Sequence, residues 1–197
     1  MSAFTKALRA CIEYREMVDR LEAENAELRE ANDAYFKHNN ILVQLMTEEQ
    51  KKKALAESAD MGAIRNSIRK GAGNAVGFLA EIMLADYLGC ERTPSKDYDL
   101  TWNGITIDVK TKETTVPPKD YYDCSIAETS LHQQCDKYLF TRYIRQGDLY
   151  VLGWIDKNKY FENARFLKKG EQDGDNGFIV RANCYNLRIN QLEDLML

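Results

Sequence analysis

The stretch between residues 97 and 112 constrains the fold more than any other part of the chain. It reads Asp-Tyr-Asp-Leu-Thr-Trp-Asn-Gly-Ile-Thr-Ile-Asp-Val-Lys-Thr-Lys. Apolar and polar residues alternate on both sides of Asn103-Gly104, and Asn-Gly between two such runs is the strongest short-range signal for a β-hairpin. A two-residue loop sets the register of the two strands. The predicted cross-strand pairs are Trp102 with Ile105, Leu100 with Ile107, and Asp99 with Asp108.

The predicted hairpin places two acidic side chains directly opposite each other. Carboxylates at such positions lie about 5 Å apart and repel. Protonation of one acid, a neighbouring lysine or a divalent cation would relieve the repulsion. Lys110 lies two residues beyond Asp108 on the same face, within reach of anything bound between the acids. We therefore expect a metal site at Asp99 and Asp108. The simpler alternative is a hairpin with a solvated charged face, in which Asp97 pairs with Lys110.

Composition excludes several classes of protein. The 197 residues suit one domain of ordinary size, or one domain with an appendage. A net charge of -4 excludes a uniformly basic nucleic-acid coat but leaves room for a local basic groove. The five scattered cysteines form no CxxC pair, which favours reduced thiols over a zinc knuckle or a disulfide framework. No signal peptide or bilayer-length apolar run is present, so we expect a soluble, cytoplasmic protein with no membrane partner.

The N-terminal part of the chain has the composition and periodicity of a long helix. From Phe4 to about Glu57 there is no Pro or Gly, and helix formers dominate. Polar asparagines at the a positions of a heptad favour two parallel chains in register. We expect residues 1–60 to form a coiled coil that makes a homodimer, and residues 61–197 to form a second domain. A helix packed on its own domain, or an antiparallel helical hairpin, is the alternative. The seam consists of Ala7, Cys11, Tyr14, Val18, Leu21, Asn25, Leu28, Asn32, Tyr35, Asn39, Leu42 and Met46.

A second helix is predicted between Asn74, near its N-cap, and Gly89, just past its end. Its core stripe would include Val76, Leu79, Ala80, Met83 and Tyr87. Glu81 lies beside that stripe on a row with Gly73, Gly77 and Ala85. Small residues one turn away allow a backbone or a ligand to come close to the Glu81 carboxylate. An ordinary surface glutamate is the alternative reading.

The rest of the chain alternates between short predicted elements. Pro117-Pro118 marks a loop, because proline interrupts regular structure. Ser125 with Glu128 forms a capping-box pattern, which predicts a helix to about Asp136. Strands are predicted over 138–144 and 149–156, a short helix or irregular segment over 159–169, and one or two strands within 178–189.

The order of these elements resembles the core of the PD-(D/E)XK nuclease superfamily, the restriction-endonuclease-like fold. Glu81 matches the acid of the leading helix, Asp99 the first motif acid, and Asp108-Val109-Lys110 the (D/E)xK tripeptide. The resemblance covers roughly residues 71 to 156. No Pro precedes Asp99, and Asp stands at 108 where Glu is more frequent. The fold class implied is α/β (α+β), with a mixed central sheet flanked by helices and the long N-terminal coiled-coil helix outside the core.

The resemblance implies a Mg²⁺-dependent deoxyribonuclease that hydrolyses the phosphodiester bonds of DNA. Asp99 and Asp108, with the backbone carbonyl of Val109, would supply oxygen ligands for Mg²⁺, for which Mn²⁺ can substitute. Lys110 would orient or help deprotonate the attacking water and screen the developing negative charge. Glu81 would hold a second metal or a metal-bound water.

Four basic residues are candidates for DNA phosphate contacts that position the nucleic acid without reading its sequence. Ordinary surface charge is the alternative for each. The four are Lys112, Arg65, Arg69 and Lys70.

The competing function is a catalytically inactive coiled-coil adaptor or assembly protein that only binds nucleic acid. The long heptad seam and the negative net charge favour it. The presence of all four polar positions of the family motif favours the enzyme. The compact core would also fit an enzyme of a bacteriophage or a mobile element.

Overall fold

The structure is a computed structural model that divides into two units, Met1–Asn40 and Ile41–Leu197. In the first unit, Ile12 and residues 14–23 are helical, as predicted. The seam asparagines Asn25, Asn32 and Asn39 lie outside the described residues. The structure describes residues 12, 14–23, 42–45, 47–61, 74–93, 95–144, 148–175 and 177–195.

The predicted domain boundary at residue 60 differs from the boundary in the structure. Strand β1 (Leu42–Leu45) pairs antiparallel with β7 (Asp148–Asp156), and helix α2 (Glu48–Met61) belongs to the second unit. The predicted heptad seam continues through Leu42 to Met46, so it spans the residues of β1. A short apolar run fits a strand as well as a helix, and the open edge of β7 supplies backbone hydrogen-bond partners that a helix cannot use.

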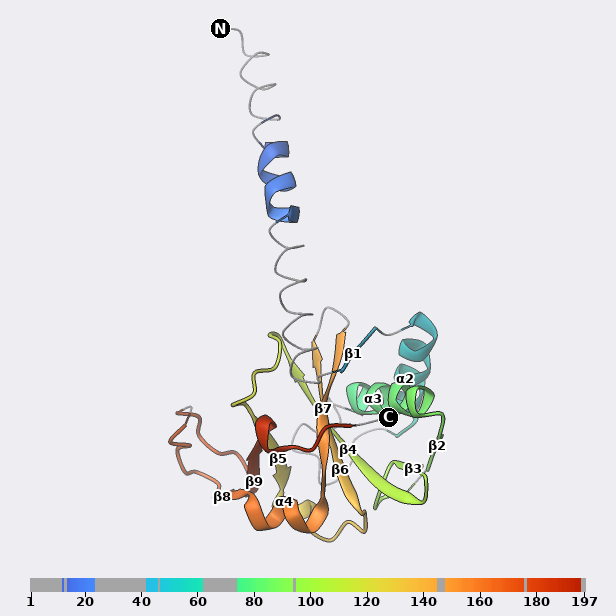
Figure 1. Cartoon of the computed structure of the whole chain (residues 1–197), viewed down its shortest axis with the longest axis vertical. Coiled ribbons are helices and arrows are strands. Elements are labelled where there is room, and N and C mark those ends of the chain that lie inside the picture. Colours follow the sequence, from blue (N-terminus) through green and yellow to red (C-terminus); the bar gives the residue numbers. More distant parts are fainter. Residues whose placement is uncertain are drawn as a thin grey trace, which may run out of the picture. The chain divides into compact units, whose positions relative to one another are not determined.

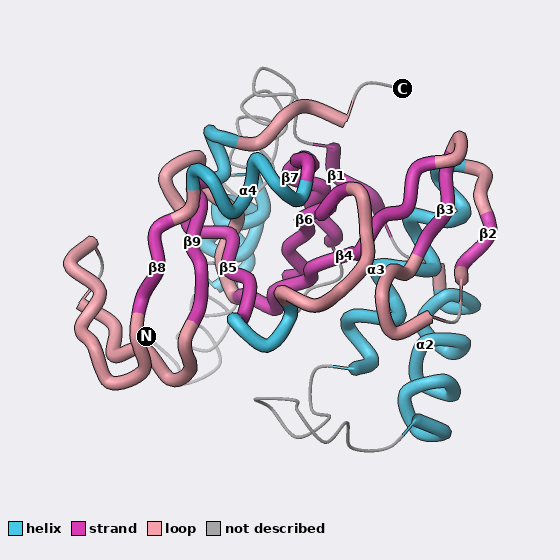
Figure 2. Tube along the Cα trace, turned by 90° about the horizontal axis from the view of Figure 1, so that it is seen from below, coloured by secondary structure: helices cyan, strands magenta, loops and turns pink. Residues whose placement is uncertain are grey.

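The second unit is an α+β structure built on a six-stranded mixed sheet. The strand order is β1-β7-β6-β4-β3-β2, in which only the β4–β6 pair is parallel among the described strands. Helices α2 and α3 cover one face of this sheet, and a three-stranded sheet, β5-β9-β8, lies with α4 on the other side (Figures 1 and 2). The remaining bounds are α3 (Asn74–Leu88), β2 (Glu91–Arg92), β3 (Leu100–Trp102), β4 (Ile105–Thr114), β5 (Asp123–Ala127), β6 (Lys137–Ile144), α4 (Lys157–Asn163), β8 (Arg165–Leu167) and β9 (Cys184–Arg188).

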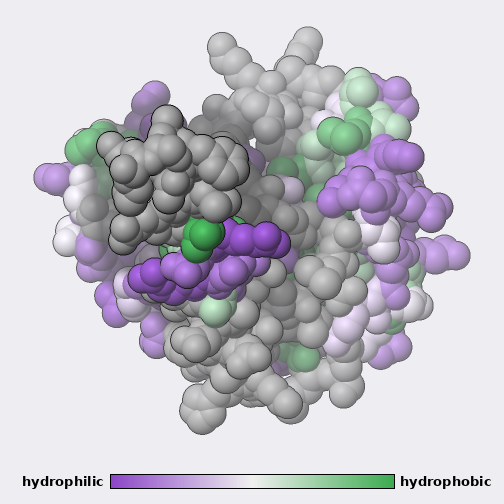
Figure 3. All heavy atoms as spheres, turned by 90° about the horizontal axis from the view of Figure 1, so that it is seen from above, coloured by the Kyte–Doolittle hydropathy of each residue, from purple (hydrophilic) through white to green (hydrophobic). Residues whose placement is uncertain are grey.

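The outer side of the helical layer is polar. Hydrophilic side chains cover much of the described surface on the α2 side of the molecule (Figure 3), where Lys52 and Lys53 are exposed. None of the helices in the described ranges combines the length and apolar composition needed to cross a bilayer.

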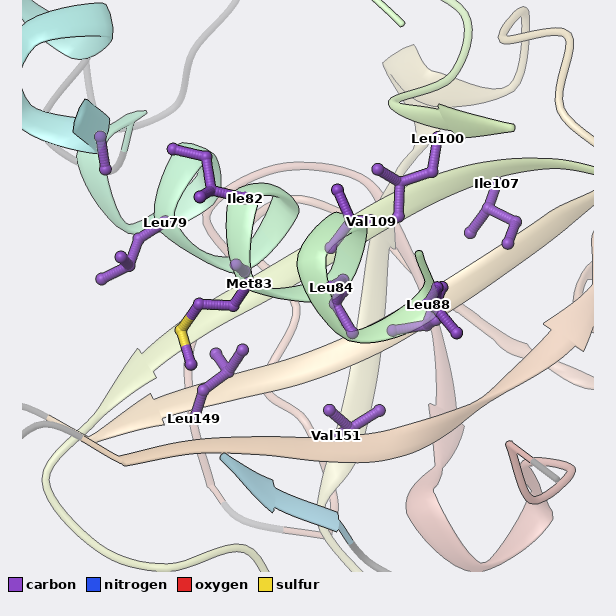
Figure 4. Close-up of a cluster of buried hydrophobic side chains, with 14 residues drawn as sticks. Leu79, Ile82, Met83, Leu84, Leu88, Leu100, Ile107, Val109, Leu149 and Val151 are labelled. Atoms are coloured by element: carbon purple, nitrogen blue, oxygen red, sulfur yellow. The ribbon is translucent and has the colours of Figure 1, made fainter. Parts of the chain in front are cut away.

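The main hydrophobic core lies between α3 and the six-stranded sheet (Figure 4). Side chains of α3 such as Met83 and Leu84 pack with Ile107 and Leu149 of the sheet. Helix α3 is apolar on most of its circumference because α2 covers part of its outer side, and the two helices are in contact. The predicted place of Tyr87 in the core is wrong, since 38% of its surface is exposed.

The predicted hairpin is confirmed. Leu100 pairs with Ile107 and Trp102 pairs with Ile105. Asn103 and Gly104 both have positive φ, 49° and 78°. A two-residue turn with positive φ at both positions matches the twist of the flanking strands, and Asn-Gly is the sequence that adopts it most readily.

The predicted helix from Ser125 to Asp136 is wrong. Strand β5 occupies its first part, followed by a 3-10 turn, η1 (Glu128–Ser130). Cys124 and Ile126 are buried at alternate positions and β5 pairs with β9. The Glu128 carboxylate accepts a hydrogen bond from the Asn183 side chain (2.9 Å) instead of capping a helix.

The other predicted elements of this region agree with the structure more closely. Strands β6 and β7 confirm the two strands predicted over 138–144 and 149–156. The segment 159–169 contains the end of α4 and all of β8, and the segment 178–189 contains β9.

Candidate active site

The two opposed acids of the hairpin lie together where β3 begins. The Asp99 backbone N–H donates to the carbonyl of Ile107 (2.9 Å), the residue that pairs with Leu100 at the start of β3. Asp99 Oδ2 accepts from the Val109 N–H at 2.7 Å. Asp108, in β4, is only 3% exposed, and its carboxyl group lies close enough to that of Asp99 to raise the pKa of Asp99. The structure thus brings together the two residues that the hairpin register places opposite each other.

The environment of Asp99 favours its protonated form. Burial raises its pKa most, followed by the negative charges of Asp108 and Glu81, while the hydrogen bond from Val109 acts in the opposite direction. The result is a pKa of about 8. At neutral pH without a bound cation, the protonated form of Asp99 is therefore favoured. Protonation is one of the ways in which the repulsion was expected to be relieved.

The ammonium group of Lys110 relieves the repulsion between Asp99 and Asp108 in a second way. Its Nζ lies 2.5 Å from Asp108 Oδ2, donates to Gln133 Oε1 at 3.0 Å, and lies 5.8 Å from the centre of the Tyr138 ring. The alternative pairing of Lys110 with Asp97 is thus not the one in the structure. Asp108 Oδ2 is buried and has no well-directed hydrogen bond among the described residues, so its contact with the ammonium group is a contact between charges.

Glu81 reaches the same cluster from α3 but is held by an arginine. Arg92 donates to Glu81 Oε2 through Nη2 (2.6 Å) and Nε (3.2 Å), and to Glu57 through Nη1 (2.7 Å). Burial raises the pKa of Glu81, and Arg92 opposes that rise. Because the charges of Glu81 and Asp108 act on each other, the helix acid contributes to the negative potential of the site.

The carboxyl pair fits a magnesium ion, whereas Glu81 is engaged elsewhere. In the described ranges, no group of three or more His, Cys, Asp or Glu side chains is arranged as a metal centre. Mg²⁺ commonly binds through one or two carboxylates and completes its shell with waters and substrate phosphate. The raised pKa of Asp99, caused by burial and by the negative charges of Asp108 and Glu81, marks a place where a cation would relieve negative charge. Asp99 and Asp108 could therefore hold the ion.

The other predicted site residues, Val109 and the four basic residues, do not all lie at the carboxyl pair. Val109 is 9% exposed, packs in the hydrophobic core, and fixes Asp99 through its N–H. Lys112 is exposed two residues beyond Lys110, at the edge of a pocket of about 420 Å³. Arg65, Arg69 and Lys70 lie outside the described residues.

Three residues of the site escape sequence reasoning. Gln133 holds Lys110, and its backbone carbonyl accepts a bond from Lys157 Nζ. Arg92 binds Glu81, and Tyr138 lies beside Lys110. The polar Gln133 just before an apolar strand was a weak signal. Nothing in the sequence links Arg92 to Glu81, since they belong to different elements.

Compared with known proteins, the sequence matches no family model and no curated protein sequence.

Proposed function

We propose that the protein is a metal-dependent nuclease that hydrolyses phosphodiester bonds of DNA, as the resemblance to the PD-(D/E)XK superfamily implies. The observation that carries the proposal is the buried Asp108, which contacts Lys110 and raises the pKa of the neighbouring Asp99. Paired acids buried on a sheet cost stability unless a proton or a cation compensates them. A fold with no use for them would do better with apolar residues.

The chemistry assigns a role to each member of the cluster. Bound Mg²⁺ would withdraw charge from the scissile phosphate and lower the pKa of a water molecule. Asp99 and Asp108 would bind the ion, for which Asp99 must first release its proton. Lys110, held by Asp108 and Gln133, would orient the attacking water and stabilise the negative charge that develops on the phosphate. Glu81 would add negative charge nearby, kept ionised by Arg92.

The order of elements supports a restriction-endonuclease-like core. Helix α3 with Glu81 covers the sheet, the β3–β4 hairpin carries Asp99 and Asp108, and β6 lies parallel to β4. The segment between β4 and β6 differs from the expected helix, because it contains β5 and η1. The proposal therefore rests mainly on the hairpin and on α3.

The alternative is a catalytically inactive DNA-binding adaptor. The observation in its favour is the engagement of Glu81 by Arg92, which leaves two carboxylates for a metal ion. An adaptor of this kind would keep its DNA contacts and lack hydrolysis.

Cleavage assays separate the two functions. Plasmid and single-stranded DNA are incubated with Mg²⁺ or Mn²⁺ and wild-type protein, Asp108→Asn or Lys110→Met. The control is Asp60→Asn, which changes an exposed acid at the end of α2. We expect cleavage by the wild type and the control, and a loss of about 100-fold or more in the two site variants. If no substrate is cut faster by the wild type than by the site variants, the nuclease proposal fails, and retained binding favours the adaptor.

We also propose that the N-terminal helix pairs two chains. Its support is the exposure of two seam residues on the described helix, 66% for Tyr14 and 50% for Leu21. Light scattering of the full-length protein should show a dimer, which Leu21→Asp dissociates and Arg20→Gln, off the seam, leaves intact. A monomeric wild type would rule out the pairing.

We further propose a cytoplasmic location. The cytoplasmic location is supported by four described cysteines that are free thiols: Cys90, Cys124, Cys135 and Cys184. A bacteriophage origin would fit the compact nuclease core. Non-reducing electrophoresis of protein taken directly from cells would test the location, since disulfide-linked species would contradict it.

A further inference from the structure

A second polar site lies beyond Lys110 on the same face of β4. It is a pocket of about 420 Å³ between the end of β4, the neighbouring strand β6 and the three-stranded sheet. The lining residues are Lys112, Tyr121, Tyr122, Asp123, Arg142, Asp175 and Arg188.

Two cations of this pocket, Lys112 and Arg142, form no ion pair among the described residues, although the negative charge of Asp123 acts on both. Arg142 is 4% exposed, and its Nη2 donates to the neutral backbone carbonyl of Asp123 at 3.1 Å. The positive charge of Arg142 also acts on Lys112. Among the described residues, no carboxylate lies at ion-pair distance from either cation. A buried guanidinium without an anionic partner is costly, and a bound anion would offset that cost.

The acids in the lining are already engaged by other arginines. Asp175 Oδ2 contacts Arg165 at 3.0 Å and Arg188 at 3.1 Å. Asp123 Oδ2 lies 3.4 Å from Arg165. The other oxygen of Asp123, Oδ1, is buried and accepts no hydrogen bond among the described residues. The cations of the lining without an ion pair are Lys112 and Arg142, on the side that continues from Lys110 along β4.

An exposed aromatic ring stands beside these cations. Tyr121 is 54% exposed and packs edge-on against Tyr122, with the ring centres 5.1 Å apart. The guanidinium of Arg142 lies 5.0 Å from the centre of the Tyr122 ring. Surfaces that bind single-stranded nucleic acid combine cations along the backbone with aromatic rings on which unpaired bases stack.

The spacing between the two sites suits one continuous strand of DNA. Lys112 follows Asp108 by four residues on the same face, which corresponds to about 13 Å along a β-strand. A stacked DNA strand rises about 3.4 Å per nucleotide, so this distance corresponds to roughly four nucleotides of a stacked strand and fewer of an extended one. A strand whose scissile phosphate lies at Asp108 would therefore reach the pocket a few nucleotides away.

We propose that this pocket binds one nucleotide of a single-stranded DNA segment, with its phosphate on Lys112 and Arg142 and its base stacked on Tyr121. The inference rests on the proposed nuclease function for the view that this segment belongs to the substrate. The substrate class that follows is DNA with an unpaired stretch, cut a few nucleotides from the nucleotide held in the pocket.

Binding measured without cleavage tests the proposal. Fluorescence anisotropy with a labelled single-stranded oligonucleotide, and with the same sequence as a duplex, is recorded in EDTA. The variants are Tyr121→Ala, Lys112→Gln and Lys112→Arg. The matched controls are Tyr87→Ala and Lys53→Gln, which change exposed residues of the helical layer on the opposite face of the sheet.

The expected pattern distinguishes stacking from charge. Tyr121→Ala should raise the Kd for the single strand about 10-fold and change the duplex Kd little, because paired bases cannot stack on the ring. Lys112→Gln should raise the Kd for the single strand about 5-fold and reduce the slope of log K against log salt by about 0.7. Lys112→Arg should restore binding, and both controls should bind like the wild type.

The pocket proposal would be overturned if single-strand binding were unchanged in both Tyr121→Ala and Lys112→Gln. It would also be overturned if Tyr121→Ala reduced the duplex affinity as much as the single-strand affinity. A wild type that fails to bind the single strand would overturn it as well. Cleavage in Mg²⁺ is scored separately. The expected binding pattern without any cleavage would reject the nuclease and leave the pocket, whereas cleavage with unchanged binding would reject only the pocket.

Discussion

Asp99 is the residue at which stability and the proposed function conflict most directly. Its pKa of about 8 in the folded protein lies far above the ordinary 3.8. Between these two pH values the folded state binds the proton and the unfolded state does not. The Asp99 contribution to stability is therefore complete below pH 4 and is lost as the pH rises toward 8.

Asp99→Asn should remove this pH dependence, because the amide resembles the protonated acid. We expect the metal-free variant to be more stable than the wild type at pH 8, by about 1–3 kcal/mol, and the difference to vanish near pH 4. Urea unfolding in EDTA at pH 4, 6 and 8 measures it. A stability difference that does not change with pH would show that the folded-state pKa of Asp99 is close to its ordinary value.

Arg92 gives a second prediction at this scale. Arg92→Met removes the bonds that keep the buried Glu81 ionised, so the pKa of Glu81 should rise further and its carboxyl group should become neutral. We expect a loss of about 2–4 kcal/mol in stability, since breaking a partly buried ion pair leaves the other charge without compensation. Glu81→Gln in the Arg92→Met background is the control and should recover part of the loss. Chemical denaturation would contradict this prediction if Arg92→Met unfolds like the wild type.

At the scale of elements, a crowded glycine in β7 and an uncrowded glycine in α3 test how closely the chain packs around them. Gly153 in β7 has φ of 133°, and a Cβ there would lie 2.6 Å from the backbone oxygen of Glu193. Gly77 in α3 has nothing within 4 Å of such a Cβ. Gly153→Ala should therefore destabilise the protein by more than about 2 kcal/mol, and Gly77→Ala should stabilise it by about 0.5–1 kcal/mol. Equal thermal unfolding midpoints for the two variants would contradict the close approach of the C-terminal segment to β7.

The secondary-structure elements differ in how well they could be predicted from the sequence. The β3–β4 hairpin was predicted correctly because its turn chemistry and alternation are local. The nearness of Asp99 to Asp108 agrees with the predicted register, although the strand pairing itself ends at Leu100 and Ile107. The helix predicted from Ser125 failed because β5 is stabilised by β9, a strand about sixty residues away whose pairing leaves no local signal. The contacts of Glu81 with Arg92 and of Lys110 with Gln133 likewise join separate elements, so only the folded chain brings them together.

For the whole molecule, metal binding should be coupled to folding and to the proton on Asp99. A ligand that binds only the folded state stabilises it by about 2.7 kcal/mol at 100 times its Kd. In a domain of this size, that raises the melting temperature by roughly 5–10 °C. Because Mg²⁺ must displace the Asp99 proton, the same Mg²⁺ concentration should raise the melting temperature more at pH 8.5 than at pH 6.5.

Differential scanning calorimetry with and without Mg²⁺ at the two pH values measures this coupling. Asp108→Asn should abolish the Mg²⁺-dependent rise at both pH values, whereas Asp60→Asn, far from the carboxyl pair in the chain, should retain it. The pH dependence separates a site at Asp99 from weak binding to surface acids, since exposed carboxylates are already ionised at pH 6.5 and bind equally well at both values. An equal rise at pH 6.5 and 8.5, or a rise that persists in Asp108→Asn, would place the bound ion away from the hairpin.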